Sequence, residues 1–377
     1  MKIGIDARFY GPEGTGVGRY VEKLLENLEK LDTENEYFVI LRKSNFPLYN
    51  PKNKNFTKVT VDAHWYSIKE QVIMPAVLNK LKLDLVHFPH FNVPLLYNGK
   101  FLVTIHDLTK LRFGREAASS RKLPVYWTKN NIYKLTMRQA LNRAAKILVP
   151  SHFVKGDILK ENNKLEKKIV VTYEAADDFV SKDLHASEGK VKEVFNKFSI
   201  KEPFILYVGN TYAYKNLDII LETLPKIDLN IKFVCIAPRD SHLAVLIKKA
   251  EKLGIRDRFI TTGFVGDQDL KTLFSKALCF VFPSLSEGFG LPGLEAMASG
   301  CPVVAAKASS LPEVYGEAAI YFNPKSSKDL SEQVASLFKN PLLRSKMVEK
   351  GFKKVKEYSW KATATETLKV YKEILDK

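Results

Sequence analysis

Short apolar runs alternate with helical patterns along this chain, and the alternation restricts its fold more than any other feature. Strands that are separated by helices pair in parallel through crossovers, so they form open sheets with helices on both faces. Two of the expected helices are Val17–Lys30 and Leu217–Leu224. The expected strands are Ile3–Asp6, Tyr37–Leu41, Lys58–Val61, Leu85–Phe88, Leu102–Ile105, Lys146–Val149, Lys168–Val171, Phe204–Val208, Lys232–Ile236, Phe259–Thr261, Ala277–Phe282, Pro302–Ala305 and Ala319–Tyr321.

The strand series is interrupted by the polar, lysine-rich segment Ser187–Pro203 and then starts again. A chain of 377 residues is long enough for two domains with separate cores. The expected fold class is therefore α/β, with two doubly wound Rossmann-like domains. We expect the N-terminal domain to span residues 1–190 and the C-terminal domain to span residues 200–358.

The net charge of +17 favours acidic partners such as phosphorylated substrates, anionic lipid or nucleic acid. A general preference for lysine in the source lineage explains the same charge equally well. The three cysteines, Cys235, Cys279 and Cys301, lie in or beside apolar runs without metal-ligand spacing, as expected for core residues in a reducing compartment. Because Met1–Asp6 reads as a strand and no apolar stretch of about 18 residues occurs, we expect a cytoplasmic location.

The stretch from Phe282 to Pro312 joins an expected strand, a glycine-containing loop and an expected helix that begins near Leu291. Glu287 lies in the loop and Glu295 lies one turn into the helix. Ligands of doubly wound sheets bind at the carboxyl ends of the strands, and helix N-terminal amides bind anions there. Both carboxylates can then accept hydrogen bonds from a polyol. The alternative is a helix cap and a solvated helix residue, but the flanking apolar runs indicate a buried parallel sheet.

This stretch contains the sequence EGFGLP followed by EAMASGCPVVA. The pattern resembles the donor-site signature of the family-four retaining glycosyltransferases, and SSLPEVYGEAAIYFNP continues the match. The resemblance implies the GT-B fold, in which two doubly wound domains face each other across a cleft. It also implies that the last helix, here about residues 360–377, packs back on the N-terminal domain. In such enzymes the first glutamate, here Glu287, lies by the donor sugar, and the second, here Glu295, holds the ribose hydroxyls. The loop residues expected to contact sugar or phosphate are Gly288, Phe289, Gly290 and Leu291.

His106 and Asp107 end the strand Leu102–Ile105, where such a pair can be catalytic, part of a metal site or a loop anchor. Metal binding is disfavoured because no second histidine lies nearby at ligand spacing. The resemblance implies that His106 hydrogen-bonds the donor sugar, and we expect Asp107 to cap its loop. His87 and His90 also follow a strand, and they either line an acceptor cleft or serve the core.

The loop after the first strand, Gly14–Tyr20, opens a helix. Arg19 stands where a dinucleotide fingerprint needs its third glycine, which argues against a nicotinamide cofactor. The resemblance implies a glycine loop that closes over the donor diphosphate and the acceptor, with Gly16 as the contacting residue. A flexible turn without a ligand role is the alternative.

Lys215 follows the first strand of the C-terminal half, where a lysine at a helix start can pair with a leaving diphosphate. The family usually supplies a basic pair here, but Asn210 stands where many members have arginine. Arg239 is a candidate replacement. Thr262, Gly263 and Phe264 resemble the family's loop beside the nucleotide base.

Asp267-Gln268-Asp269 matches a spacing that can hold a divalent metal on a nucleotide sugar, but it also precedes an expected helix. We expect the segment to form the N-cap and the first turn of that helix. The resembled family works without an essential metal, so the expected cofactor set is empty and the nucleotide-diphosphate sugar is a co-substrate.

Residues 110–146 are rich in basic side chains interleaved with aromatic ones, and Glu116 is the only acid among the residues 108–150. One interpretation is a membrane-surface patch that meets a lipid-linked acceptor, which places the protein peripherally on the inner face of the membrane. The other is a solvated basic helix. Nucleic acid is not an expected partner because no recognition motif accompanies the charge. The basic residues are Lys110, Arg112, Arg115, Arg121, Lys122, Lys129, Lys134, Arg138, Arg143 and Lys146, and the aromatic ones are Phe113, Tyr126, Trp127 and Tyr133.

The resemblance therefore predicts a retaining hexosyltransferase that moves mannose from GDP-mannose to a glycan or lipid-linked glycan in surface polysaccharide synthesis. Its catalytic residues are expected to be His106, Lys215 and Glu287. Reaction on one face of the sugar, with the leaving phosphate taking the acceptor proton, is part of the same implication. The alternatives are a UDP-dependent glucosyl- or N-acetylhexosaminyltransferase, a non-catalytic nucleotide-sugar-binding subunit and a UDP-sugar epimerase.

Overall fold

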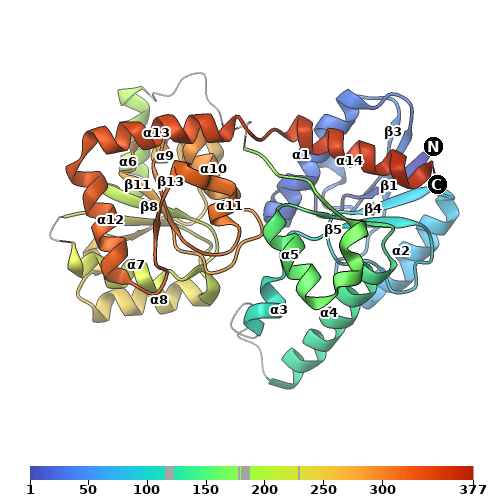
Figure 1. Cartoon of the computed structure of the whole chain (residues 1–377), viewed down its shortest axis with the longest axis horizontal. Helices are drawn as coiled ribbons and strands as arrows, with labels where there is room; N and C mark the ends of the chain where they lie inside the picture. The colour runs from blue at the N-terminus through green and yellow to red at the C-terminus, as the bar shows by residue number, and fades with distance from the viewer. Residues whose placement is uncertain (115–122, 177–178, 180–186, 228–229, 377) are drawn as a thin grey trace. The chain divides into compact units, whose positions relative to one another are not determined.

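The structure is a computed structural model that describes residues 1–114, 123–176, 179, 187–227 and 230–376. The chain divides into two compact units (Figure 1). Unit 1 contains Met1–Leu111, Ser120–Glu174 and Trp360–Lys377, and unit 2 contains Arg112–Ser119 and Ala175–Ser359. The main division thus falls after residue 174, earlier than the expected boundary near residue 190.

Unit 1 is built on a seven-stranded parallel sheet in the order β3-β2-β1-β4-β5-β6-β7. Its strands are β1 (Lys2–Asp6), β2 (Glu36–Leu41), β3 (Phe56–Thr60), β4 (Leu85–Phe88), β5 (Phe101–Thr104), β6 (Lys146–Val149) and β7 (Ile169–Val171). The helices that accompany them are α1 (Thr15–Leu31), α2 (Ile68–Leu81), α3 (Thr109–Phe113), α4 (Leu123–Arg143), α5 (His152–Glu161) and α14 (Trp360–Leu375).

Unit 2 is built on a six-stranded parallel sheet in the order β10-β9-β8-β11-β12-β13. Its strands are β8 (Phe204–Val208), β9 (Lys232–Ile236), β10 (Phe259–Thr261), β11 (Cys279–Phe282), β12 (Val303–Ala306) and β13 (Ala319–Phe322). Its helices are α6 (Glu188–Phe198), α7 (Asp218–Thr223), α8 (Ser241–Lys252), α9 (Asp267–Lys276), α10 (Leu291–Ala298), α11 (Leu311–Tyr315), α12 (Ser327–Lys339) and α13 (Pro341–Val355). Short 3-10 turns across the chain are Pro12–Gly14, Phe46–Leu48, Asn163–Lys168, Ala213–Lys215, Leu224–Lys226, Arg256–Arg258 and Gly316–Ala318.

The strand order reverses once in each sheet, between β1 and β4 in unit 1 and between β8 and β11 in unit 2. Loops that leave the carboxyl ends of two such strands diverge, and the crevice between them is where ligands of doubly wound sheets bind. The strands themselves are apolar because both of their faces are covered by helices (Figure 1), and all four residues of β4, β5, β11 and β12 are buried.

The thirteen strands within the described residues occur where the apolar runs predict them, with ends that differ by no more than two residues. The lysine-rich segment Ser187–Pro203, expected as a plain connection, instead contains helix α6. Ser187 caps it by accepting a hydrogen bond from the backbone N–H of Lys190, and Val194 is buried. α6 is held against α9 by Asp269, which pairs with Lys190 at 3.0 Å and with Lys197 at 2.7 Å. The helix was not expected, because the polar composition of the segment outweighed the helical spacing of its few apolar residues.

The chain returns to unit 1 in its last helix, which packs against α1. The rings of Trp360 and Tyr20 lie 6.3 Å apart, and the Thr363 hydroxyl donates to the carbonyl oxygen of Tyr173 at 2.6 Å. Within the described ranges, none of the helices combines the length and the apolar character needed to cross a bilayer.

Candidate functional site

The loops that leave β8 and β11 in unit 2 are bound to each other at the point where the strand order reverses. The backbone N–H of Leu285 donates to the carbonyl oxygen of Tyr214 at 2.8 Å, and the Asn216 side chain donates to the carbonyl oxygen of Pro283 at 3.3 Å. Lys215 lies in the short turn Ala213–Lys215, which precedes α7. This arrangement brings Lys215 to Glu287.

Lys215 and Glu287 form an ion pair in which the ammonium Nζ lies 2.6 Å from the carboxylate Oε1. The two side chains are only 12% and 14% exposed, so the pair is screened less than a surface pair. The backbone of Glu287 is also fixed, because its N–H donates to the Ser309 hydroxyl and its carbonyl accepts from the Ser310 hydroxyl, both at 3.0 Å. Two residues that were expected in one site therefore touch each other in a rigid setting.

The glycine loop after Glu287 is tightly packed from below. Gly290 has a φ of 101° and precedes the first residue of α10, and its carbonyl accepts a hydrogen bond from the Tyr315 hydroxyl at 2.5 Å. A Cβ atom at Gly290 would lie 2.5 Å from that hydroxyl, so both the conformation and the space require glycine. The Phe289 ring packs against Tyr358, with the centroids 5.4 Å apart. Hence the loop is rigid, and the Phe289 side chain serves the core.

The remaining members of this loop lie close to the start of α10. Gly288 is buried and Leu291 is partly exposed as the first residue of the helix. Glu295 is 9% exposed, so the alternative of a solvated helix residue does not hold for it. The buried carboxylate of Glu295 thus lies one turn below the loop that carries Glu287.

The loops after β8, β9 and β10 carry the other residues expected to contact a donor. The Asn210 carbonyl accepts from the Tyr207 hydroxyl at 2.6 Å, which fixes the turn that follows β8. Gly263 has a φ of 77°, and a Cβ atom there would lie 3.4 Å from the Arg239 Nε, so Arg239 lies against this loop. Thr262 donates through its hydroxyl to the Gly263 carbonyl at 3.0 Å, and the Phe264 side chain is 88% exposed.

In unit 1, both ring nitrogens of His106 face hydrogen-bond acceptors. Nδ1 lies 2.9 Å from Oε1 of Glu174, and Nε2 lies 2.9 Å from the carbonyl oxygen of Pro89. The ring edge also packs on Tyr20, with centroids 4.8 Å apart. Glu174 follows β7, and no sequence pattern singled it out, because a lone glutamate after a strand is an ordinary loop residue.

This geometry determines where the protons of the pair lie. A carbonyl oxygen cannot donate, so Nε2 of His106 carries a proton, and a further proton must lie between Nδ1 and the Glu174 carboxylate. Burial by itself lowers the pKa of His106, but the hydrogen bond to Glu174 and its charge outweigh burial, so that pKa lies above its ordinary value. His106 is therefore held as a charged or proton-sharing group, and both of its ring nitrogens are engaged within unit 1.

His87 and Asp107, which lie near His106 in the sequence, have structural roles. His87 is fully buried between the Tyr371 hydroxyl at 2.7 Å and the Thr104 hydroxyl at 2.8 Å, so it does not line a cleft. Burial lowers the pKa of His87 to about 3, helped by the charge of His106. Asp107 accepts from the backbone N–H of Thr109 at 2.8 Å and so caps its loop.

The glycines of the loop after β1 differ in what surrounds them. A Cβ atom at Gly14 or Gly18 would lie 1.9 Å or 2.2 Å from a backbone carbonyl oxygen, so these two glycines permit close chain approach. A Cβ atom at Gly16 would meet nothing within 4 Å, and Gly16 is exposed in the first turn of α1. The backbone at Gly16 is thus open to its surroundings, whereas Gly14 and Gly18 are closely packed.

The segment Asp267–Asp269 forms the first turn of α9, as expected, with Gly266 rather than an aspartate at the N-cap position. Asp269 is occupied by its ion pairs with Lys190 and Lys197. Across the part of the chain that the structure describes, no three histidine, cysteine or acidic residues gather closely enough to hold a metal ion. Cys235, Cys279 and Cys301 are buried free thiols.

The basic segment 110–146 is described in part. Arg115, Glu116, Arg121 and Lys122 lie outside the described residues, as do the side chains of Tyr126, Trp127 and Lys129. At its end, Arg143 donates to the carbonyl oxygen of Leu95 at 3.0 Å, and Lys146 lies 3.5 Å from the Glu373 carboxylate. These two cations therefore take part in packing, whereas Lys110 lies 4.2 Å above the ring of Tyr133.

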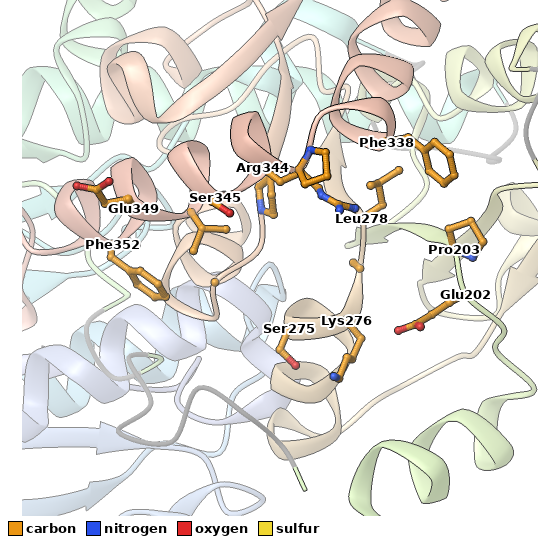
Figure 2. Close-up of a pocket in the computed structure, with 15 residues that line it drawn as sticks. Glu202, Pro203, Ser275, Lys276, Leu278, Phe338, Arg344, Ser345, Glu349 and Phe352 are labelled. Atoms are coloured by element: carbon orange, nitrogen blue, oxygen red, sulfur yellow. The ribbon is translucent and has the colours of Figure 1, made fainter. Parts of the chain in front are cut away.

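A cavity of about 690 Å³ lies at the opposite end of the unit 2 sheet. It is lined by Pro203, Leu278 and Pro302, the residues just before β8, β11 and β12, and by α13 residues such as Arg344 and Phe352 (Figure 2). Lys215 and Glu287 lie at the other end of this sheet, on the loops that leave the carboxyl ends of β8 and β11, and Thr262 follows the carboxyl end of β10. Since ligands of doubly wound sheets bind at carboxyl ends, we place the site there and not in this cavity.

Comparison with known proteins matches both halves of the chain. The family described as "Glycosyltransferase Family 4" matches residues 14–178, and "Glycosyl transferases group 1" matches residues 190–354. "O-antigen chain mannosyltransferase B" of Escherichia coli is 26% identical over 95% of this chain and 96% of its own length. "O-antigen chain mannosyltransferase RfbU" of Salmonella typhimurium is 25% identical over 88% and 89% of the two chains.

Solved structures resemble the whole chain. Sucrose-phosphate synthase from Thermosynechococcus elongatus superposes with a TM-score of 0.78 at 17% identity, covering 100% of this chain and 99% of that one. WaaG, described as a glycosyltransferase involved in lipopolysaccharide biosynthesis, gives a TM-score of 0.74 at 14% identity over 98% and 99%. At these identities the likeness establishes the fold. The chain is therefore a glycosyltransferase of family four, with the GT-B fold and a resemblance to the mannosyltransferases of that family.

Proposed function

We propose that this protein is a retaining mannosyltransferase that uses GDP-mannose and extends a glycan or lipid-linked glycan of a surface polysaccharide. The observation that carries the proposal is the Lys215–Glu287 ion pair at the reversal point of the unit 2 sheet, beside the start of α10. Two relatives that match nearly the full chain are O-antigen mannosyltransferases by name, which supports mannose and a polysaccharide acceptor.

In the proposed mechanism the donor diphosphate lies over Lys215 and the backbone amides at the start of α10. The acceptor oxygen forms a bond to the anomeric carbon as the bond from that carbon to the phosphate oxygen breaks on the same face of the sugar. The proton of the acceptor hydroxyl passes to the leaving phosphate oxygen. Lys215 and the amides stabilise the negative charge that grows there, because fixed donors act most strongly where charge develops.

The carboxylates and the unit 1 histidine are proposed to hold the sugar nucleotide. Glu287 lies beside the sugar, and Glu295 accepts hydrogen bonds from the ribose hydroxyls. The backbone of Thr262, Gly263 and Phe264 lies by the base, and Arg239 supplies the second cation that Asn210 lacks. The engaged nitrogens of His106 mean that a hydrogen bond to the sugar would replace an existing one, so His106 acts mainly through its charge and fixed position.

The proposal includes no metal and no cofactor, since the cations of the protein serve the diphosphate. It also retains the basic segment 110–146 as a surface that meets an anionic membrane from the inner face. Lys134 and Arg138, which are exposed on α4, are the described residues that would serve it, whereas Arg143 and Lys146 take part in packing. Vesicles with and without anionic lipid test this part, and equal co-sedimentation with both would remove it.

The central test is release of nucleoside diphosphate from a panel of GDP-, UDP-, ADP- and dTDP-sugars in chelator-treated buffer, with Glu287→Gln as the impaired control. GDP release from GDP-mannose, strongly slowed in the variant, is the expected result. Release from a UDP-sugar alone would overturn the donor assignment. Conversion of a sugar without any acceptor or diphosphate release would point to an epimerase, and binding without turnover to a non-catalytic subunit. The anomeric configuration of the product, read by NMR, tests retention.

A further inference from the structure

We propose that unit 1 carries an aromatic platform that binds a pyranose ring of the acceptor glycan. We use the name aromatic platform for His64, Trp65, Tyr66 and His90. It lies on the loops that follow β3 and β4, and β4 adjoins β1 where the strand order reverses. The inference rests on the proposed function for the identity of the substrate class, but the geometry that carries it is separate from the Lys215–Glu287 site.

The rings of the platform form a continuous surface over one supporting side chain. Phe9, the buried residue beneath, stacks on Trp65 with centroids 4.5 Å apart and an interplanar angle of 21°, and lies 5.1 Å from His90. His64 lies 4.3 Å from Trp65, and Tyr66 lies 6.0 Å from His90 in an edge-to-face arrangement. These separations fall in the range of favourable ring pairs, so the four side chains support one another.

The platform is open at its outer side. Tyr66 is 58% exposed and the His64 side chain is 52% exposed, although large aromatic residues usually bury most of their surface in a core. An exposed cluster of rings on a monomer marks a binding surface more often than an isolated apolar residue does. A ligand with an apolar face can therefore pack on these exposed rings.

The backbone beneath Tyr66 is held in an unfavourable conformation by a buried carboxylate. Tyr66 has a φ of 63°, a region that residues with a Cβ atom seldom adopt. Its N–H donates to Oε2 of Glu70 at 2.9 Å, and Glu70 is fully buried. The helix that follows is fixed as well, because the Ser67 hydroxyl accepts from the Glu70 N–H at 3.2 Å. The loop is thus locked with the Tyr66 ring outward.

Glu70 belongs to a buried cluster of charges that extends to β1. Arg8, which is 1% exposed, donates to both carboxylate oxygens of Asp6 at 2.7 Å, to Oε1 of Glu70 at 2.5 Å and to the carbonyl oxygen of Ala63 at 3.2 Å. Asn92 donates to the same Glu70 oxygen at 2.6 Å. Burying such charges brings little net stability, so their evident effect here is to fix the loops after β1, β3 and β4 in one arrangement.

A saccharide fits this surface better than a lipid does. The C–H face of a pyranose matches an exposed aromatic ring, and its hydroxyls need hydrogen-bonding groups at the edge. The ring nitrogens of His64 and His90 supply polar groups within the platform. Arg42 adjoins it, because its guanidinium lies 4.8 Å over the Trp65 ring and donates to Glu13 at 3.0 Å. Ile68 and Val72, which are exposed on the adjacent helix α2, offer only apolar atoms, as a lipid contact would. The platform differs from them because its rings also carry polar atoms.

The first experiment follows the indole N–H signal of Trp65 in ¹⁵N-labelled full-length protein. The chain has three tryptophans, so Trp65→Phe assigns the signal. Methyl α-D-mannopyranoside, methyl α-D-glucopyranoside and N-acetylglucosamine are titrated separately, in the presence and absence of GDP. A saturable shift of the Trp65 signal with at least one glycoside is expected, and no shift with any of them would overturn the proposal. This readout does not depend on turnover, so it separates failure of the platform from failure of the proposed function.

The matched variants are Tyr66→Gly, Tyr66→Phe and Ile68→Ala. Glycine accepts the positive φ without strain, so Tyr66→Gly removes the ring while it relieves the backbone. We expect it to weaken binding of the shifting glycoside, and to raise the KM for it as acceptor, about tenfold, with the KM for the donor unchanged. Tyr66→Phe keeps the ring and should retain most of the glycoside binding, and Ile68→Ala should have no effect on it. Equal losses in Tyr66→Gly and Ile68→Ala, together with lost vesicle binding, would assign the surface to lipid and refute the saccharide platform.

Discussion

Replacing Glu287 by glutamine should tighten the binding of nucleoside diphosphate while it slows turnover. In the ligand-free structure Lys215 is neutralised by Glu287 at 2.6 Å, so a diphosphate that takes up Lys215 has to weaken this ion pair. At an effective dielectric constant of about 20, the direct attraction at that distance is about 6 kcal/mol. Desolvation and side-chain ordering offset most of it, and about 1.5–3 kcal/mol remains for such a charged hydrogen bond.

Glutamine at position 287 keeps a neutral acceptor, whose hydrogen bond with Lys215 is worth about 1 kcal/mol. The difference of about 0.5–2 kcal/mol corresponds to about 2- to 30-fold tighter binding. Isothermal titration calorimetry with GDP and UDP measures it directly. Glu317→Gln removes the same charge from an exposed side chain of unit 2 and serves as the control, for which we expect no change.

Turnover of Glu287→Gln should fall at the same time, by about 30- to 150-fold, because a preorganised polar contact to the sugar contributes about 2–3 kcal/mol to transition-state stabilisation. Opposite changes in ground-state binding and turnover are the signature of a group that acts in the reaction. A Kd for GDP that is unchanged or weaker in Glu287→Gln would refute the competition argument. Unchanged turnover would remove Glu287 from the mechanism.

Three further predictions test other parts of the site. Gly16→Ala should keep wild-type thermal stability and lose donor or acceptor affinity. Gly18→Ala, whose Cβ would lie 2.2 Å from a carbonyl oxygen, should unfold at a clearly lower temperature. Equal unfolding temperatures of the two variants by calorimetry would contradict the packing argument. Glu174 raises the pKa of His106, so the pair stabilises the folded protein fully below about pH 6.5, and this stabilisation is lost as pH rises through the raised pKa. Urea titrations should therefore show the largest loss of folding stability in Glu174→Gln at acidic pH. A stability loss that grows with pH would contradict this prediction. Diphosphate release should be unaffected by a chelator of divalent ions, and a rate that returns only when magnesium is added back would establish a metal requirement.

The strands were predictable because their signal is local. β4, β6, β8, β9 and β10 have the bounds that their apolar runs indicate, since a strand that is buried on both faces reads directly as an apolar run. Helix α6 was not predicted. Its apolar positions, among them Val194, are separated by lysines, and two of those lysines pair with Asp269 of α9. Composition therefore did not predict α6, because part of what holds this helix is its contact with α9, which is distant in the sequence.

The site shows the same division. The motif around Glu287 and Glu295 identified the loop, and the structure places it at the reversal point of the sheet. Glu174 was missed, because its importance lies only in its distance from His106. The role of Glu70 was missed for the same reason: in the sequence it is one acid in an ordinary helix start, and in the structure it fixes Tyr66.

The sequence by itself determined the alternation of strands and helices, the glycine positions and the resemblance to a glycosyltransferase family, because these are patterns within short windows of the chain. Tertiary structure alone decided which charged groups meet. Lys215 and Glu287 are 72 residues apart, His106 and Glu174 are 68 apart, and Arg8 and Glu70 are 62 apart. Strand order and register bring each pair to the carboxyl edge of a sheet, and no local pattern encodes such a distance.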